Sequence, residues 1–126
     1  MQQEVFGPHL TIDGKKCDKE KLSDLTIVFK ALDELPAIIG MTKIMPPYSI
    51  LYKGVVPEDW GVSGFVMIAE SHISIHTFPE KNYVFIDVFS CKMFDVDKAV
   101  DFLVKTFGIK ELDKEMVKRG ICFPRK

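Results

Sequence analysis

The residues best suited to chemistry are concentrated in the segment 69–80, whose sequence is AESHISIHTFPE. These twelve residues include two histidines, two serines, a threonine and two glutamates. A serine with a histidine close by is the pairing that nucleophilic catalysis needs, because the imidazole can take the proton of the hydroxyl. His72 and His76 could also share one face of a strand, but no CxxC or HExxH pattern surrounds them, so we predict no metal site.

The same segment alternates as a β-strand does, since successive side chains of a strand point to opposite faces. Positions 71, 73, 75 and 77 hold Ser, Ile, Ile and Thr on one face, whereas positions 72, 74, 76 and 78 hold His, Ser, His and Phe on the other. Periodicity alone favours an amphipathic strand of an antiparallel sheet, with the isoleucines inward and the polar groups toward water. A catalytic serine beside a histidine is the alternative interpretation.

Further strands must hold this segment in place. The strand 62–69 should pair with it as a hairpin, which puts Glu70 and Ser71 at or near the tight connection. The dipeptide Pro46-Pro47 places the strand that follows it at a sheet edge or a bend. Alternation and apolar content indicate the remaining strands at 7–17, 48–53, 83–91 and, as a charged edge strand, 110–120.

Two helices are expected between these strands. The first should be capped by Asp18 or Ser23 and should end or kink near Glu34, because Pro36 removes a hydrogen-bond donor. The second should begin at Asp95 or Asp97, carry an apolar stripe and end at the glycine in position 108.

Runs of strands interrupted by helices predict an α+β fold, a two-layer sandwich in which a mainly antiparallel sheet has both helices on one face. The other face of the strand 83–91 would carry Phe85, Asp87, Phe89 and Cys91, which is too aromatic a surface to be left in water. We therefore expect a second copy of the chain to cover it, sheet against sheet, in a homodimer.

Length and composition fit one domain, residues 1–126, with 47% hydrophobic residues and a sizeable core. A formal net charge of −1 argues against binding to nucleic acids or anionic membranes. No apolar run is long enough to span a membrane and the first residues lack a signal-peptide pattern, so we expect a cytoplasmic protein. The three cysteines are too few and too far apart for a disulfide framework. A solvated basic tail is expected from Lys118, Arg119, Arg125 and Lys126.

Several segments together resemble a known family. The segments 62–68 (VSGFVMI), 70–72 (ESH) and 75–80 (IHTFPE) are similar to the core of the pyruvoyl-dependent S-adenosylmethionine decarboxylases of the short prokaryotic class. Asp87 and Cys91 fall where that family has an Asp-x-Phe-[Ser/Thr]-Cys segment. The likeness extends more weakly to His9-Leu10 and Cys17-Asp18, and it implies the same fold with sites at a dimer interface.

The resemblance implies a self-processing enzyme. Ser71 Oγ would attack the carbonyl of Glu70, and the resulting ester would break by β-elimination and hydrolysis to leave a pyruvoyl group at position 71. The products would be a β chain of residues 1–70 and an α chain of residues 71–126. The pyruvoyl carbonyl would then form a Schiff base with S-adenosylmethionine and act as the electron sink for loss of CO2, giving an aminopropyl donor for spermidine and other polyamines.

The resemblance also implies roles for individual residues. His76 would be the base that takes the α-proton of Ser71 during elimination. Ser63 would hydrogen-bond the tetrahedral intermediate of processing as an oxyanion donor. Cys91 would return a proton to the decarboxylated substrate.

Substrate recognition is less firmly determined by sequence. Glu80 suits the ribose diol, and the rings of Phe78 and Trp60 suit the base or the sulfonium. The loop before position 62 is longer than expected and carries Glu58 and Asp59, which could instead pair with a cationic substrate. An arginine or ornithine decarboxylase on the same fold, and a dimerising module that never cleaves, therefore stay open as alternatives.

Overall fold

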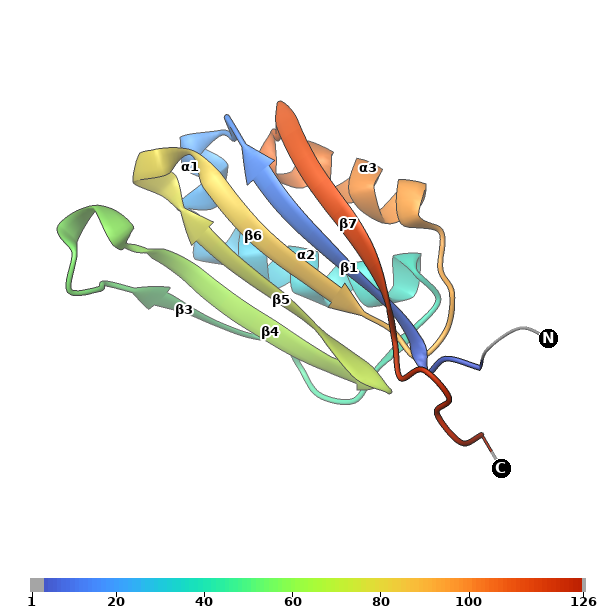
Figure 1. Cartoon of the computed structure of the whole chain (residues 1–126). Coiled ribbons are helices and arrows are strands. Elements are labelled where there is room, and N and C mark those ends of the chain that lie inside the picture. The colour runs from blue at the N-terminus through green and yellow to red at the C-terminus, as the bar shows by residue number, and fades with distance from the viewer. Residues whose placement is uncertain (1–3, 126) are drawn as a thin grey trace.

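A computed structural model describes residues 4–125, in which seven strands form one antiparallel sheet with helices on one of its faces (Figure 1). The spatial order of the strands is β2-β4-β5-β6-β1-β7, and β3 also pairs with β4. The α+β fold with a mainly antiparallel sheet is thereby confirmed. The strands are β1 (Gly7–Lys15), β2 (Thr42–Lys43), β3 (Tyr48–Tyr52), β4 (Gly61–Ala69), β5 (Ser71–Phe78), β6 (Tyr83–Phe89) and β7 (Glu111–Arg119).

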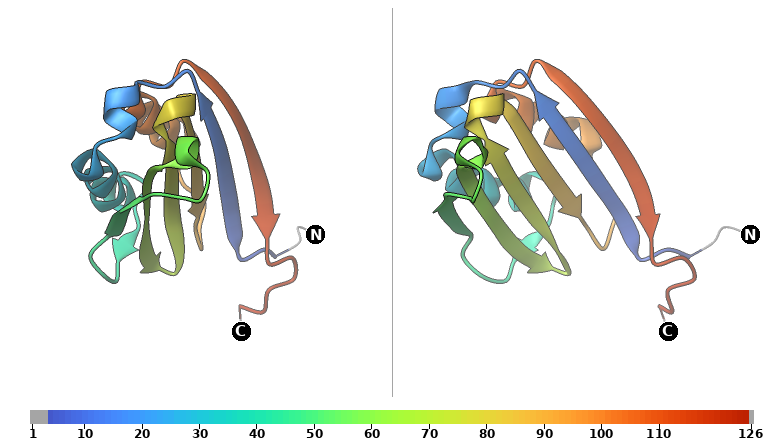
Figure 2. Two further views of the ribbon diagram at one scale, coloured as in Figure 1. Left: turned by 90° about the vertical axis from the view of Figure 1, so that its left-hand side faces the viewer. Right: turned by 60° about the vertical axis from the view of Figure 1, so that its left-hand side comes forward.

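The helices are α1 (Lys19–Leu22), α2 (Leu25–Ile38) and α3 (Val96–Phe107), with 3₁₀ turns η1 (Pro57–Asp59) and η2 (Pro79–Lys81). Viewed edge-on, all three helices lie on the same side of the sheet (Figure 2). The described chain thus has one more helix than the two expected, because a short turn, α1, precedes the long helix.

The core lies between the helices and the inward face of the sheet. Strand alternation sends every second side chain of β1, β4, β5 and β6 toward the helices, where it is almost fully buried. These residues and their helical partners are Leu10, Ile12, Val62, Val66, Ile68, Ile73, Ile75, Val84, Ile86 and Val88, with Leu22, Val28, Ala31, Leu32, Leu35, Ala99, Val100, Leu103 and Phe107. Burying these apolar surfaces is the main force that holds the two layers together.

The start and end of α2 differ from the expectation. Asp24, rather than Ser23, caps this helix, and its carboxylate accepts the backbone N–H of Thr26 at 2.8 Å. Asp18 caps the short helix α1 instead. The long helix neither ends nor breaks near Glu34 but continues past a buried Pro36 to Ile38. Proline removes a single intrahelical bond here, and it does so in the last turn of a helix whose buried face includes Pro36 itself.

The second long helix agrees with the sequence pattern. Asp95 caps α3 by accepting the N–H of Lys98 at 3.1 Å, and Gly108 ends it in the left-handed conformation, with φ of 62°. Glycine suits that position because residues with a Cβ are strained at positive φ. The edge position of the segment after Pro46-Pro47 is also confirmed, since β3 pairs only with β4 among the described strands.

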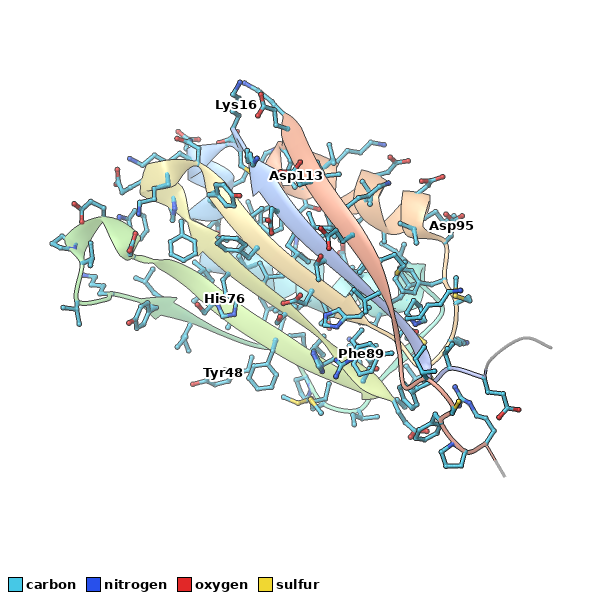
Figure 3. The ribbon with its side chains drawn as sticks, in the orientation of Figure 1. Lys16, Tyr48, His76, Phe89, Asp95 and Asp113 are labelled. Carbon is cyan, nitrogen blue, oxygen red and sulfur yellow. The ribbon has the colours of Figure 1, made fainter. Side chains whose placement is uncertain are left out.

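The second face of the sheet is open in the single chain. Side chains that alternate with the buried ones point away from the helices, and several are large and apolar. Phe65, Met67 and Phe85 are each about two-fifths exposed, at 41%, 40% and 42%. Figure 3 shows His76, Phe89 and Tyr48 along this open face. No helix in the described part of the chain is long and apolar enough to cross a membrane.

The basic residues Lys118, Arg119 and Arg125 are exposed, as expected of a solvated basic segment, but two of them also contact other parts of the chain. The guanidinium of Arg119 lies 4.3 Å from the ring centroid of Phe89 and donates to His9 Nδ1 at 3.3 Å. Arg125 stacks on aromatic rings and bonds backbone carbonyls of other segments. Lys126 lies outside the described residues.

Candidate active site

Ser71 opens β5, directly after the tight connection in which Glu70 joins β4 to β5. Its φ of 152° is a backbone conformation that residues other than glycine rarely adopt. Its Oγ is buried and has no hydrogen-bond partner among the described residues. Burying a hydroxyl without a hydrogen-bond partner costs free energy of folding. Such a group at a strained turn is therefore more typical of a functional site than of a structural one.

Cys91 lies against this connection. The backbone N–H of Glu70 donates to Cys91 Sγ at 3.4 Å, and the same sulfur is 3.9 Å from the carbonyl oxygen of Ala69. Antiparallel pairing of β5 with β6 brings the cysteine there, since His72 stands opposite Phe89. A thiol that can give up a proton is thus held beside the peptide that precedes Ser71.

Ser63 and His76 form a second polar pair, on β4 and β5. They stand directly opposite each other in the register of the two strands, and His76 Nδ1 is 2.9 Å from Ser63 Oγ. Both side chains are on the open face, with His76 exposed and Ser63 half-buried. The pair has the geometry expected of a hydroxyl that an imidazole can activate or orient.

The structure does not bring this pair to Ser71 within one chain. Ser71 and His76 are five residues apart on one strand, which at about 3.3 Å per residue separates them by roughly 16 Å. The sequence groups the residues in one short segment, but the strand holds Ser71 with Cys91 at one end of the sheet and Ser63 with His76 toward the other. The predicted site residues thus fall into two separate pairs, which we name the Ser71–Cys91 and Ser63–His76 half-sites.

A cavity of about 550 Å³ adjoins the Ser63–His76 half-site. Its volume falls in the range of small-molecule pockets. Phe78 lines it together with Ser63, His76 and Thr77. The end of β3, the connection after it and the start of β4 supply the other lining residues: Tyr52, Gly54, Val55, Val56, Asp59 and Gly61. Of the two rings that sequence suggested for the substrate, Phe78 lines this cavity.

Trp60 is placed differently. It lines a neighbouring hollow of about 560 Å³ with Leu51, Lys53, Gly54 and Pro57. Its indole N–H donates to Glu80 Oε1 at 3.2 Å, and the ammonium of Lys19 donates to Glu80 Oε2 at 3.1 Å. The hydrogen bonds from Lys19 and then from Trp60 hold the pKa of Glu80 below its ordinary value, which keeps the carboxylate ionised.

The acidic residues of the preceding loop are partly engaged. Asp59 forms an ion pair with Lys81, with 2.7 Å between Nζ and Oδ1. That pairing neutralises one of the two carboxylates that the sequence suggested for a cationic substrate, whereas the other, Glu58, is exposed.

Sequence reasoning did not foresee a further polar cluster on the open face near the Ser71 end. His9 Nε2 is 3.2 Å from Asp87 Oδ1, and Ser74 donates to Asp87 Oδ2 at 3.3 Å. His72 packs edge-on against His9, and burial followed by the charges of His9 and Arg119 lowers the pKa of His72. Strand alternation could have placed His72, Ser74 and Asp87 on one face, but it carries no information on contacts with strands distant in sequence.

Comparisons with known proteins agree across nearly the whole chain. Residues 8–120 match the family model described as S-adenosylmethionine decarboxylase. The S-adenosylmethionine decarboxylase proenzyme of Pyrococcus furiosus is 34% identical over 119 residues, which cover 94% of this chain and 81% of that protein. The proenzyme of Geobacillus kaustophilus is 31% identical over 118 residues, covering 94% of this chain and 90% of that protein.

A solved structure shows the same architecture. The crystal structure of the adenosylmethionine decarboxylase from Aquifex aeolicus superimposes with a TM-score of 0.79 at 27% sequence identity. The match covers 98% of this chain and 97% of that one, so it includes both half-sites.

Proposed function

Because the chain belongs to the S-adenosylmethionine decarboxylase family, we propose that it decarboxylates S-adenosylmethionine and that it first cuts itself between Glu70 and Ser71. The relatives are named proenzymes, which supports the self-processing. The observation that carries the proposal is the buried Ser71 Oγ, which has no hydrogen-bond partner in the described chain and lies at a strained turn. A nucleophile free of competing bonds can attack the carbonyl that precedes it.

The residues around position 71 fit a pyruvoyl group made from the serine. Cys91 Sγ accepts the N–H of Glu70 and so holds the Ala69–Glu70 peptide, which directly precedes the one that would be cut. A pyruvoyl group would supply the carbonyl that serves as electron sink when an amino acid loses CO2. After decarboxylation Cys91 Sγ would return a proton to the α-carbon of the substrate.

The second half-site would act from a neighbouring copy of the chain. Ser63 and His76 lie too far along the strand to reach Ser71 of their own chain. The open face that carries them also exposes Phe65 and Phe85, an apolar surface suited to burial against another sheet. In a homodimer with opposed strand directions, His76 of one chain would take the α-proton of Ser71 in the other, and Ser63 would donate to the oxyanion.

The substrate would occupy the cavity beside the same half-site. Phe78, which lines the cavity, offers a ring for the base or the sulfonium. Glu80 lies two residues further along the chain, outside the lining residues, and its ionised carboxylate would offer acceptors for the ribose hydroxyls. The product, decarboxylated S-adenosylmethionine, would donate aminopropyl groups in polyamine synthesis. Of the two loop acids, Asp59 lines the cavity and Glu58 does not, and Asp59 is paired with Lys81. This pairing favours the nucleoside substrate over arginine or ornithine, because it leaves the cavity without a free Asp59 charge.

Release of CO2 from carboxyl-labelled substrates tests the proposal. The purified protein should release labelled CO2 from S-adenosylmethionine but not from arginine or ornithine, and methylthioadenosine should compete for the nucleoside pocket. Borohydride, which reduces the carbonyl, should abolish release, and the Ser71→Ala chain should show none. Release from arginine or ornithine alone would overturn the substrate, and release by the Ser71→Ala chain would overturn the pyruvoyl chemistry.

A further inference from the structure

The segment after β7 packs against the residues that precede β1, at the same end of the sheet as Ser71. Gly120 turns the chain with φ of 72°, and the N–H of Cys122 donates to the carbonyl of Glu4 at 2.6 Å. The ring of Phe123 packs edge-on against Phe6, with 5.0 Å between centroids. In Figure 1 this segment continues from β7 past the start of β1. It also contacts the connection after β6, since Arg125 donates to the carbonyl of Cys91.

Arg125 is the centre of this arrangement. Its Nη2 donates to the carbonyl oxygens of Val5 at 3.2 Å, of Phe6, and of Cys91 at 3.3 Å. Its guanidinium carbon is 5.3 Å from the ring centroids of both Phe6 and Phe123. Although Arg125 is exposed, its planar cation lies beside two aromatic rings and has one amino group, with two N–H bonds, within hydrogen-bond distance of three carbonyls, which restricts its rotation.

We propose that Arg125 is a positioning residue for Cys91. The cysteine is then held from two sides, since its carbonyl accepts from Arg125 and its sulfur accepts from Glu70 N–H. This inference rests on the proposed function, in which Cys91 Sγ returns the proton. A positional error of about 1 Å in a reacting group can cost on the order of a hundredfold in rate, so an anchor on the backbone of Cys91 matters to the reaction.

The contact also spans the proposed cut. Cleavage after Glu70 would leave Val5 and Phe6 on the β chain, whereas Cys91 and Arg125 would be on the α chain. Arg125 thus keeps the end of the α chain on the β chain after the covalent link is lost. A lysine at position 125 would keep the positive charge. It could not stack on the aromatic rings or present several N–H donors in a fixed plane, as the guanidinium does.

Loss of the anchor has a chemical signature that differs from simple loss of activity. If the proton reaches the carbon derived from Ser71 instead of the α-carbon of the substrate, hydrolysis by water leaves alanine at position 71 and releases the substrate carbon as an aldehyde. Each such event inactivates one site and changes the mass of the α chain. A misplaced thiol raises the share of these events among all turnovers.

The first test therefore counts alanine-ended α chains per CO2 released. Arg125→Ala should raise this ratio by about ten- to hundredfold and lower kcat more than it raises KM. Arg125→Lys should fall between Arg125→Ala and the unaltered chain. Lys118→Ala is the matched control, because it removes an exposed basic residue of the same region, and its ratio should equal that of the unaltered chain.

The second test does not need the processed enzyme. In the Ser71→Ala chain, iodoacetamide alkylation at Cys91 should quicken several-fold when Arg125 is also replaced by alanine, whereas the buried Cys17 should stay unchanged. If both the alanine ratio and the alkylation at Cys91 are unchanged in folded Arg125→Ala and Arg125→Lys chains, the proposal is overturned. If the unaltered chain never cleaves itself but the alkylation rate at Cys91 still depends on Arg125, the proposed function is overturned. The positioning of Cys91 by Arg125 would then still be supported.

Discussion

Ser71 and His76 lie on the same strand, β5, yet at about 3.3 Å per residue roughly 16 Å separates them. His76 contacts Ser63 instead, with 2.9 Å between Nδ1 and Oγ. The proposed nucleophile and its proposed base therefore belong to different half-sites of one chain. Processing would need a base from a second copy.

This arrangement predicts complementation between two inactive chains. A His76→Ala chain should remain uncut alone, because no copy in its dimer has the base. A Ser71→Ala chain should also remain uncut, because it has no nucleophile. When both are expressed together, mixed dimers should cut the His76→Ala chain at Ser71, since the partner's His76 is intact. Intact-mass spectrometry of the co-purified chains measures this.

The control for complementation is co-expression of His76→Ala with Ser63→Ala/His76→Ala, which has no base in any pairing. Fragments should be absent from that mixture. Cutting of the His76→Ala chain when expressed alone would show that the base comes from elsewhere.

Glu80 should matter for substrate affinity more than for processing. Replacing it with glutamine removes the charge that Lys19 and Trp60 hold in place and weakens the acceptors offered to the ribose. Glu80→Gln should therefore raise KM for S-adenosylmethionine about ten- to hundredfold while self-cleavage proceeds normally. Glu58→Gln, a change to an exposed acid of the nearby loop, is the control and should leave KM unchanged.

His72 should make stability fall in mild acid. Burial, then the charge of His9, lowers the pKa of His72, with Arg119 adding to the effect and Asp87 opposing it. Below the ordinary histidine pKa of 6.5 the unfolded chain therefore binds more protons at this site than the folded chain, and stability is lost as the pH falls. The test uses the Ser71→Ala chain, which stays uncut, with and without the further change His72→Gln. The urea concentration at the unfolding midpoint should fall between about pH 7.5 and about pH 5.5, and it should fall less in the chain that carries His72→Gln. An equal difference in both chains would contradict the assignment.

Cys17 should be inert toward alkylation. Burial raises the pKa of its thiol to about 11, so the reactive thiolate is scarce near neutral pH. At about pH 8, Cys17 should be alkylated at least roughly tenfold more slowly than the exposed Cys122, as peptide mass spectrometry can resolve. Comparable rates at the two residues would mean that the strand end around Cys17 opens readily.

Much of the fold follows from local sequence. The alternation that places Ile73 and Ile75 inward, and the glycine that ends α3, are short-range signals that the structure confirms. The prediction that the helix ends near Glu34 is wrong, because losing one hydrogen bond in the last turn costs less free energy than the packing of that turn contributes. Local sequence rules account for the lost hydrogen bond but not for the burial of the turn.

The candidate site could be predicted by residue type but not by arrangement. Resemblance singled out Ser63, Ser71, His76 and Cys91, yet the extended strand keeps apart residues that sequence places five positions from each other. The bond from Arg125 to Cys91 joins residues 34 positions apart, and no periodicity encodes it. Contacts of that range depend on how the whole sheet folds.

The most direct test is the intact mass of the freshly purified protein under denaturing conditions. Dividing 14.4 kDa in the ratio of 70 to 56 residues, we expect fragments of about 8 and about 6.4 kDa. The smaller should weigh less than a serine-ended fragment by one molecule of ammonia, as a pyruvoyl end requires. A single species of 14.4 kDa that persists through long incubation would contradict cleavage at Ser71 and the chemistry built on it.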